Sequence, residues 1–286
     1  MQVRHSQLES KLAGWESDLS LLDPAGFAHR FAIQDDLDRY FFEPVPLALD
    51  PDRDLLSRAH ALSTKLDLVN ERLFNSMRRQ IQRGACPAEF LPIMRDLATP
   101  PRGLAYDYLD DLLAGVLQFE PRSVEPHPLE PDSVFYQPTP ARHIFHLIGA
   151  AAITTADTLI DLGSGLGHVP LLASICTGAT SVGIELDPTW VESASKCAGT
   201  LNLSQTTFLT QDAREADLSS GSVFYLYTPF TGATLASVLQ SLRKQASLRP
   251  IRICTFGHCT LAVSDQPWLI PATSPVADQI TVFLPR

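Results

Sequence analysis

The stretch that decides the fold is Leu159-Ile160-Asp161-Leu162-Gly163-Ser164-Gly165-Leu166-Gly167-His168. It joins a short hydrophobic run to three closely spaced glycines, and a helical pattern follows. Glycine permits positive φ angles and removes side chains that would keep a ligand from the carboxyl end of a strand, where open α/β sheets bind their ligands. We therefore expect a strand, a tight ligand-binding turn and a helix, in this order.

The spacing of the glycines separates this turn from that of dinucleotide-binding folds. Those folds use GxGxxG and seat a pyrophosphate on the helix N-terminus, whereas this chain has GxGxG. Asp161 precedes the first glycine by two residues, and its charge would repel a diphosphate but could accept hydrogen bonds from an ammonium group. A second acid, Glu185, ends the next predicted strand, where a carboxylate can accept from both hydroxyls of a ribose.

Short β-branched or aromatic runs alternate with helical patterns from residue 157 onward. The predicted strands are Thr158–Leu162, Ser181–Glu185, Thr206–Leu209, Val223–Tyr227 and Ile251–Phe256, and the predicted helices are His168–Thr177, Pro188–Ala198 and Gly232–Gln245. Such alternation predicts a doubly wound, mostly parallel sheet with helices on both faces. Two further runs, Trp268–Ile270 and Ile280–Leu284, predict an antiparallel C-terminal hairpin, so that the α/β sheet has seven strands.

The region before the sheet has helical periodicity, with its longest apolar stripe running from Leu55 to Ile81. Six prolines follow between residues 120 and 140, where neither a helix nor a central strand can persist. We therefore predict an all-helical N-terminal domain over 1–120, a proline-rich linker over 121–140 and the ligand-binding domain over 141–286. Thr139 is expected to cap a helix that begins with Pro140.

The composition restricts the function further. The 286 residues are 45% hydrophobic and carry a net charge of −10, which disfavours binding of extended nucleic acid because phosphates require clustered positive charge. Five cysteines without CxxC spacing indicate a reducing compartment, with the cytoplasm as the default, and predict no metal site. No run approaches the ~18 apolar residues that cross a membrane, so no membrane partner is expected. The sequence makes no prediction of the oligomeric state.

The glycine motif resembles that of the class I S-adenosylmethionine-dependent methyltransferases, which have a Rossmann-like fold. In that family D/E-x-G-x-G-x-G wraps the amino acid part of the cofactor, the acid after the second strand holds the ribose, and an acid after the third strand contacts the adenine amino group. The resemblance implies S-adenosylmethionine as cofactor and implies that its site comprises Asp161, Gly163, Ser164, Gly165, Gly167, Glu185, Leu186, Gln211, Asp212 and Ala213. Stretches 161–168 and 183–187 are also similar to the Dot1-type lysine methyltransferases.

The fourth predicted strand ends in Tyr225-Leu226-Tyr227-Thr228-Pro229-Phe230, where the family often has an (N/D)-P-P-(Y/F) loop. Pro229 and Phe230 agree with this loop, whereas Tyr227 and Thr228 replace its first two residues. The resemblance implies Tyr227 and Phe230 as candidate catalytic residues. Upstream, we expect Tyr136 or Thr139 to touch the methionine part of the cofactor.

Three functions compete on these residues. The leading hypothesis is a methyltransferase that acts on a small molecule or a protein side chain, because methyl transfer from a sulfonium can be catalysed largely by alignment. One alternative is a NAD-dependent oxidoreductase, which the glycine spacing and Asp161 disfavour. The other is a cofactor-binding module without catalysis that acts through partner contacts of its helical domain. The acceptor itself does not follow from the sequence.

Overall fold

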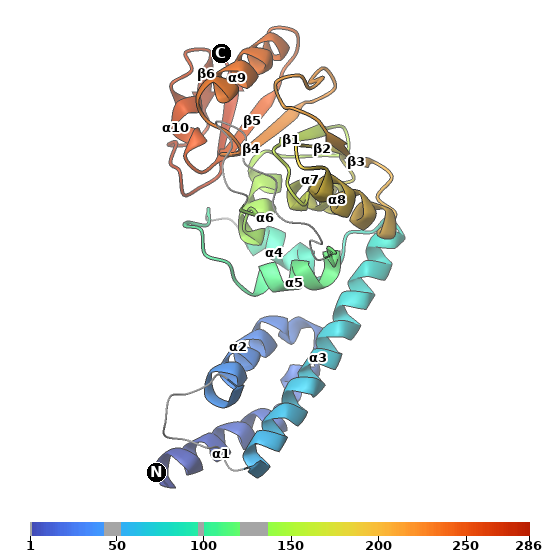
Figure 1. The fold of residues 1–286 in the computed structure, drawn as a ribbon, viewed down its shortest axis with the longest axis vertical. Coiled ribbons are helices and arrows are strands. Elements are labelled where there is room, and N and C mark those ends of the chain that lie inside the picture. Colours follow the sequence, from blue (N-terminus) through green and yellow to red (C-terminus); the bar gives the residue numbers. More distant parts are fainter. Residues whose placement is uncertain (1, 43–52, 97–99, 121–136) are drawn as a thin grey trace. The chain divides into compact units, whose positions relative to one another are not determined.

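The computed structural model describes residues 2–42, 53–96, 100–120 and 137–286 (Figure 1). Internal contacts divide the chain into two compact units, Met1–Met77 with Asp107–Val116, and Arg78–Tyr106 with Leu117–Arg286. This division differs from the predicted boundaries, because residues 78–106 group with the sheet. Helical periodicity reveals that a segment is helical but does not show which core it joins. Most of the predicted linker, up to residue 136, lies outside the described residues.

The first unit consists of helices in the part of the chain that is described. Its elements are α1 (Gln2–Ser17), η1 (Leu19–Leu22), η2 (Pro24–Gly26), α2 (Phe27–Leu37), the π-helical turn η3 (Asp38–Phe42), most of α3 (Arg53–Gln82) and α5 (Tyr108–Leu117). Fully buried leucines from α1, α2 and α3, such as Leu12, Leu37 and Leu66, form its core. The apolar stripe predicted α3 over nearly its whole length, whereas α2 was missed because Arg30 interrupts its stripe.

Arg30 is fully buried and organises the turns that precede α2. Its Nε donates to Oδ1 of Asn70 at 2.6 Å, and its Nη1 donates to the carbonyl oxygens of Leu21 and Asp23 at 3.0 and 2.5 Å. Burial lowers the pKa of Arg30, because removal from water disfavours the charged guanidinium. The guanidinium is therefore stabilised by neutral oxygens that its fixed fork of donors reaches in several directions.

The second unit contains the sheet and the helices around it (Figure 1). Its elements are α4 (Phe90–Asp96), α6 (Ala141–Ala150), β1 (Thr158–Leu162), α7 (His168–Thr177), β2 (Thr180–Glu185), α8 (Pro188–Thr200), β3 (Thr206–Thr210), β4 (Val223–Tyr227), α9 (Gly232–Ala246), β5 (Arg252–Phe256), α10 (Cys259–Ser264), β6 (Leu269–Pro271) and β7 (Thr281–Pro285). The strands are ordered β3-β2-β1-β4-β5-β7-β6. β1 to β5 pair in parallel, and β7 is antiparallel to both β5 and β6. The predicted fold class is confirmed.

The order of the strands creates the place for a ligand. β1 lies between β2 and β4, so the chain winds outward in opposite directions on the two sides of β1. In open α/β sheets, ligands bind outside the carboxyl ends of the strands at such a reversal. The residues that follow β1, β2 and β4 therefore lie together at the carboxyl-terminal edge of the sheet, where the parallel strands end.

One local prediction is wrong, and one short helix was not predicted. α6 begins at Ala141 with Pro140 in the capping position, and the Thr139 hydroxyl lies 2.9 Å from the phenolic oxygen of Tyr225 instead of capping the helix. The short helix α10 was missed, since six residues are too few to display a helical period.

Replacing Arg30 by Met should lower the free energy of unfolding by about 2–4 kcal/mol, because two buried oxygens and one partly buried oxygen lose a charged donor. The exposed Arg39, which pairs with Asp35 at 3.5 Å, provides the control, and Arg39→Met should cost less than about 1 kcal/mol. Urea unfolding followed by circular dichroism measures both variants. Equal losses in the two would contradict the role given to Arg30.

Candidate functional site

The glycine loop between β1 and α7 has the backbone conformation that its sequence predicts. Gly163, Gly165 and Gly167 have φ angles of 86°, 51° and 79°, a region that disfavours other residues. A Cβ atom added to Gly163 would lie 2.3 Å from Cβ of Pro229, and one added to Gly167 would lie 2.2 Å from the ring of Phe208. Both glycines are thus required by backbone conformation and by close neighbours.

Glu185, at the end of β2, connects the glycine loop to the turn before α8. Its Oε2 accepts from the N–H of Gly165 at 2.9 Å, and its Oε1 accepts from the N–H groups of Leu186 and Asp187 at 2.7 and 3.1 Å. The carbonyl of Ile184 accepts from two further N–H groups of the loop, at 2.8 and 3.0 Å. The carboxylate and the adjacent carbonyl therefore hold the loop against the end of β2.

Asp161 lies within β1, two residues before the loop, and is 4% exposed. Burial and the nearby carboxylate of Glu185 raise the pKa of Asp161 well above its ordinary value. The position thus disfavours a negative charge in the absence of a cation. A positively charged group at this point would stabilise the ionised carboxyl.

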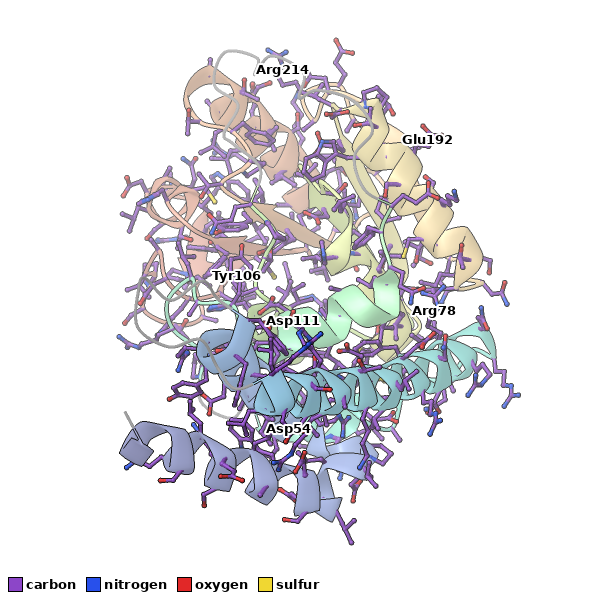
Figure 2. All side chains as sticks on the ribbon, turned by 60° about the horizontal axis from the view of Figure 1, so that its bottom comes forward. Asp54, Arg78, Tyr106, Asp111, Glu192 and Arg214 are labelled. Carbon is purple, nitrogen blue, oxygen red and sulfur yellow. The ribbon has the colours of Figure 1, made fainter. Side chains whose placement is uncertain are left out.

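The residues after β3 reach the same edge but are engaged locally. Asp212 accepts from the backbone N–H of Arg214 at 2.8 Å and pairs with its guanidinium, and these hydrogen bonds lower the pKa of Asp212 (Arg214 is labelled in Figure 2). The side chain of Gln211 donates to the carbonyl of Glu215 at 3.2 Å, and Ala213 is buried. The adenine contact of Asp212 stays a prediction and would have to compete with Arg214.

The other predicted cofactor residues have distinct surroundings. The Oγ of Ser164 is buried without a hydrogen-bond partner among the described residues. Leu186 is 46% exposed beside Glu185. Thr139 is buried and bonded to Tyr225, the residue that pairs in register with Asp161. Tyr136 lies outside the described residues, so its contact with the cofactor stays a prediction.

The two predicted catalytic residues differ in their exposure. Tyr227 ends β4, and its ring lies 4.7 Å from that of Phe256. The hydroxyl of Tyr227 is buried without a partner in the described structure, and burial raises its pKa to about 12. Phe230 is 7% exposed and belongs to the hydrophobic core between the sheet and α9. The structure gives Phe230 a packing role, and its contact with substrate stays a prediction.

Thr228 was named from the sequence only as a departure from the family's loop, and its backbone conformation is unfavourable for its residue type. Its φ angle is +37°, although it is β-branched and precedes a proline. A conformation of this kind costs about 1–3 kcal/mol and persists only where the surroundings enforce it. No sequence signal reveals it, because threonine before proline usually adopts an extended conformation.

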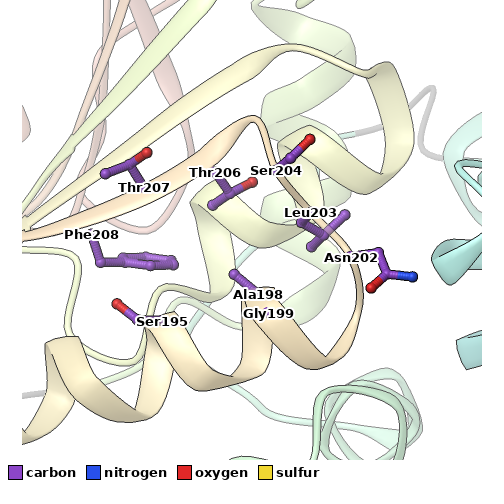
Figure 3. A pocket seen from close by; sticks show the side chains of 9 residues that line it. All are labelled: Ser195, Ala198, Gly199, Asn202, Leu203, Ser204, Thr206, Thr207 and Phe208. Carbon is purple, nitrogen blue, oxygen red and sulfur yellow. The ribbon is translucent and has the colours of Figure 1, made fainter.

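A pocket of about 520 Å³ lies elsewhere, between α8 and the start of β3 (Figure 3). It is lined by Ser195, Ala198, Gly199, Asn202, Leu203, Ser204, Thr206, Thr207 and Phe208. None of these residues belongs to the predicted cofactor site. Phe208 nevertheless links the two regions, because its ring fills the space beside Gly167 and Gly183.

Within the described residues, no group of three or more His, Cys, Asp or Glu side chains is arranged to bind a metal ion. No described helix is both long and apolar enough to traverse a lipid bilayer.

Asp161→Asn should increase the free energy of unfolding at pH 7, because asparagine has no charge to bury. A folded-state pKa above the unfolded value means that the contribution of Asp161 declines as the pH rises from about 4 toward its folded-state pKa. The advantage of the variant should therefore grow over this interval. Urea unfolding at several pH values measures it, with the exposed Asp217→Asn as control. An Asp161→Asn protein less stable than wild type at pH 7 would contradict the burial argument.

No family model and no curated protein matches the chain. Among solved structures, an RNA methyltransferase from Salinibacter ruber in complex with S-adenosyl-L-homocysteine is 28% identical, with 52% of this chain and 92% of that chain covered and a TM-score of 0.43. Magnesium protoporphyrin IX methyltransferase from Synechocystis PCC 6803 with bound S-adenosylmethionine is 15% identical (50% and 76% covered, TM-score 0.39). Precorrin-6y C5,15-methyltransferase from Geobacter metallireducens is 12% identical (52% and 89% covered, TM-score 0.40). The further likeness to Dot1-type enzymes finds no support in these comparisons. Over about half of its length, the chain is similar to methyltransferases of solved structure.

Proposed function

We propose that this chain is an S-adenosylmethionine-dependent methyltransferase whose acceptor is a small molecule or a protein side chain. One observation carries the proposal: the buried carboxyl of Asp161, the glycine loop and Glu185 meet at the carboxyl ends of the adjacent strands β1 and β2. This edge borders the point where the strand order reverses, which is where open α/β sheets bind ligands.

The residues at this edge fit the chemistry of S-adenosylmethionine. Its ammonium group would stabilise the ionised form of Asp161. The buried hydroxyl of Ser164, which has no hydrogen-bond partner in the described part of the chain, can form a hydrogen bond with a polar atom of the methionine part. Glu185 already accepts three N–H groups, and a carboxylate offers about four acceptor positions, so one position is left for a ribose hydroxyl. Exposed Leu186 offers apolar surface to the adenine.

When bound, the cofactor supplies an electrophilic methyl group on a sulfonium with a good leaving group. The task of the chain is then to orient the two reactants, and alignment of this kind can contribute up to ~7–11 kcal/mol. Tyr227 stands at the end of β4, beside β1, and its hydroxyl has no hydrogen-bond partner among the described residues. Because burial raises its pKa to about 12, the phenol of Tyr227 stays neutral at pH 7. It can orient the methyl-accepting substrate through a hydrogen bond without serving as a general base.

The net charge of the chain favours some classes of methyl acceptor over others. With a net charge of −10, the chain lacks the cation excess that extended nucleic acid requires, so we place a small molecule or a protein side chain first. The similar Salinibacter ruber protein is described as an RNA methyltransferase, which makes RNA the class to include as a comparison in acceptor screens.

Isothermal titration distinguishes this function from the alternatives. S-adenosylhomocysteine should bind with micromolar affinity, and NAD should not bind detectably, because the GxGxG loop and Asp161 disfavour a diphosphate. Binding of NAD alone would favour an oxidoreductase. Binding of S-adenosylhomocysteine without methyl transfer to small-molecule, protein or RNA acceptor panels would favour a non-catalytic module.

Glu185→Gln should weaken the binding of S-adenosylhomocysteine by tenfold or more, because the amide nitrogen would face N–H donors and the charge on the ribose acceptor is lost. Glu192, an exposed acid on α8, offers the matched control, and Glu192→Gln should leave the affinity unchanged (labelled in Figure 2). Titration calorimetry measures both. If the two variants bind S-adenosylhomocysteine equally well, Glu185 does not contribute to cofactor binding.

A further inference from the structure

Thr228 and Cys259 form two reciprocal hydrogen bonds, each from the backbone N–H of one residue to the side chain of the other. The N–H of Thr228 donates to Sγ of Cys259 at 3.3 Å, and the N–H of Cys259 donates to Oγ1 of Thr228 at 3.1 Å. The hydroxyl of Thr228 also donates to the carbonyl of Phe256 at 3.3 Å. The thiol of Cys259 is buried, and its pKa is raised by burial, so it remains a neutral thiol. We call this reciprocal arrangement the Thr228–Cys259 bracket.

The bracket explains why Thr228 persists in a strained conformation. The segment after β5 turns back through Gly257, which has a φ of 80°, and a Cβ atom there would lie 2.4 Å from Oγ1 of Thr228. The glycine therefore gives the hydroxyl room to reach the N–H of Cys259. Strain in the loop after β4 is thus maintained by hydrogen bonds with the end of β5 and the start of α10.

The consequence of this strain reaches the glycine loop. Pro229 follows Thr228 directly, and it lies so close to Gly163 that a Cβ atom on the glycine would be 2.3 Å away. A relaxed, extended Thr228 would redirect the chain at this point and move the proline ring. The conformation of Thr228 therefore sets the position of one wall beside the predicted cofactor loop.

We propose that Thr228 and Cys259 are positioning residues, which hold Pro229 against Gly163 and thereby keep the glycine loop in its cofactor-binding conformation. Neither residue needs to touch the cofactor. This inference rests on the proposed function, since it assumes that the glycine loop binds an adenosyl cofactor. It adds that binding depends on hydrogen bonds between the loop after β4 and the first residue of α10.

Titration with S-adenosylhomocysteine tests the bracket on three variants. Thr228→Val keeps the shape but removes the hydroxyl, and it should weaken binding by about tenfold. Cys259→Ala removes the acceptor of the Thr228 N–H and should act in the same direction. Thr228→Ser retains the hydroxyl and should restore binding to within about threefold of wild type. This rescue is not expected if residue 228 contributes only bulk.

A fourth variant separates positioning from stability. Thr228→Gly relieves the positive φ angle and removes the hydroxyl, so its free energy of unfolding should fall less than that of Thr228→Val, while its affinity for S-adenosylhomocysteine should fall at least as much. A purely structural role would move stability and affinity together. Parallel changes of the two quantities across the four variants would overturn the inference.

The remaining outcomes are also decisive. If the wild type fails to bind S-adenosylhomocysteine, the proposed function fails; if the wild type and Thr228→Val bind equally well, only the bracket fails. Should both Thr228→Val and Cys259→Ala fail to fold, amide hydrogen exchange on the wild type decides, with the N–H groups of Thr228 and Cys259 expected to be protected and to gain protection when S-adenosylhomocysteine binds. Unprotected amides, or protection that the ligand leaves unchanged, would overturn the inference.

Discussion

The carboxylate of Glu185 is the constraint on which the candidate site depends. It accepts hydrogen bonds from Gly165 on one side and from Leu186 and Asp187 on the other, so a single group fixes both the glycine loop and the start of the β2–α8 turn. Bonds of this type are charge-assisted and roughly twice as strong as neutral ones. Because the loop has few side chains of its own, its conformation is imposed by the strand next to it.

A second constraint acts from the other side of β1. The loop after β4 is held in a strained turn, and its proline contacts the first glycine of the motif. The glycine loop is therefore confined between the end of β2 and the end of β4, the two strands that flank β1 in the sheet. This confinement leaves the glycine loop little conformational entropy to lose, as the proposed role in cofactor binding requires.

The fold could be predicted from the sequence because its signals are local. Strand β1, helix α7 and strand β4 have the predicted bounds, and α8 begins at Pro188 as predicted. The grouping of residues 78–106 with the sheet could not be predicted, since it depends on contacts between segments far apart in the chain.

The candidate site was predictable only in part, for the same reason. The spacing of the glycines, Asp161 and Glu185 predicted that these residues lie close together, and they do. The pairing of Asp212 with Arg214 and the burial of Phe230 could not be predicted, because they depend on the conformation of exposed turns and on core packing. The hydrogen bond between Thr228 and Cys259 joins two residues 31 positions apart, and no periodicity or motif in the sequence predicts it.

Phe208 shows how far the edge strand takes part in this arrangement. Its ring occupies the space that side chains at positions 167 and 183 would need, so a single aromatic residue on β3 stands beside glycines in the loop and on β2. These three positions form a steric set. Gly183 lacks the positive φ angle of Gly167, so in related chains a larger residue at 183 should be accompanied by a smaller one at 208, and an alignment of such chains would display this exchange as covariation.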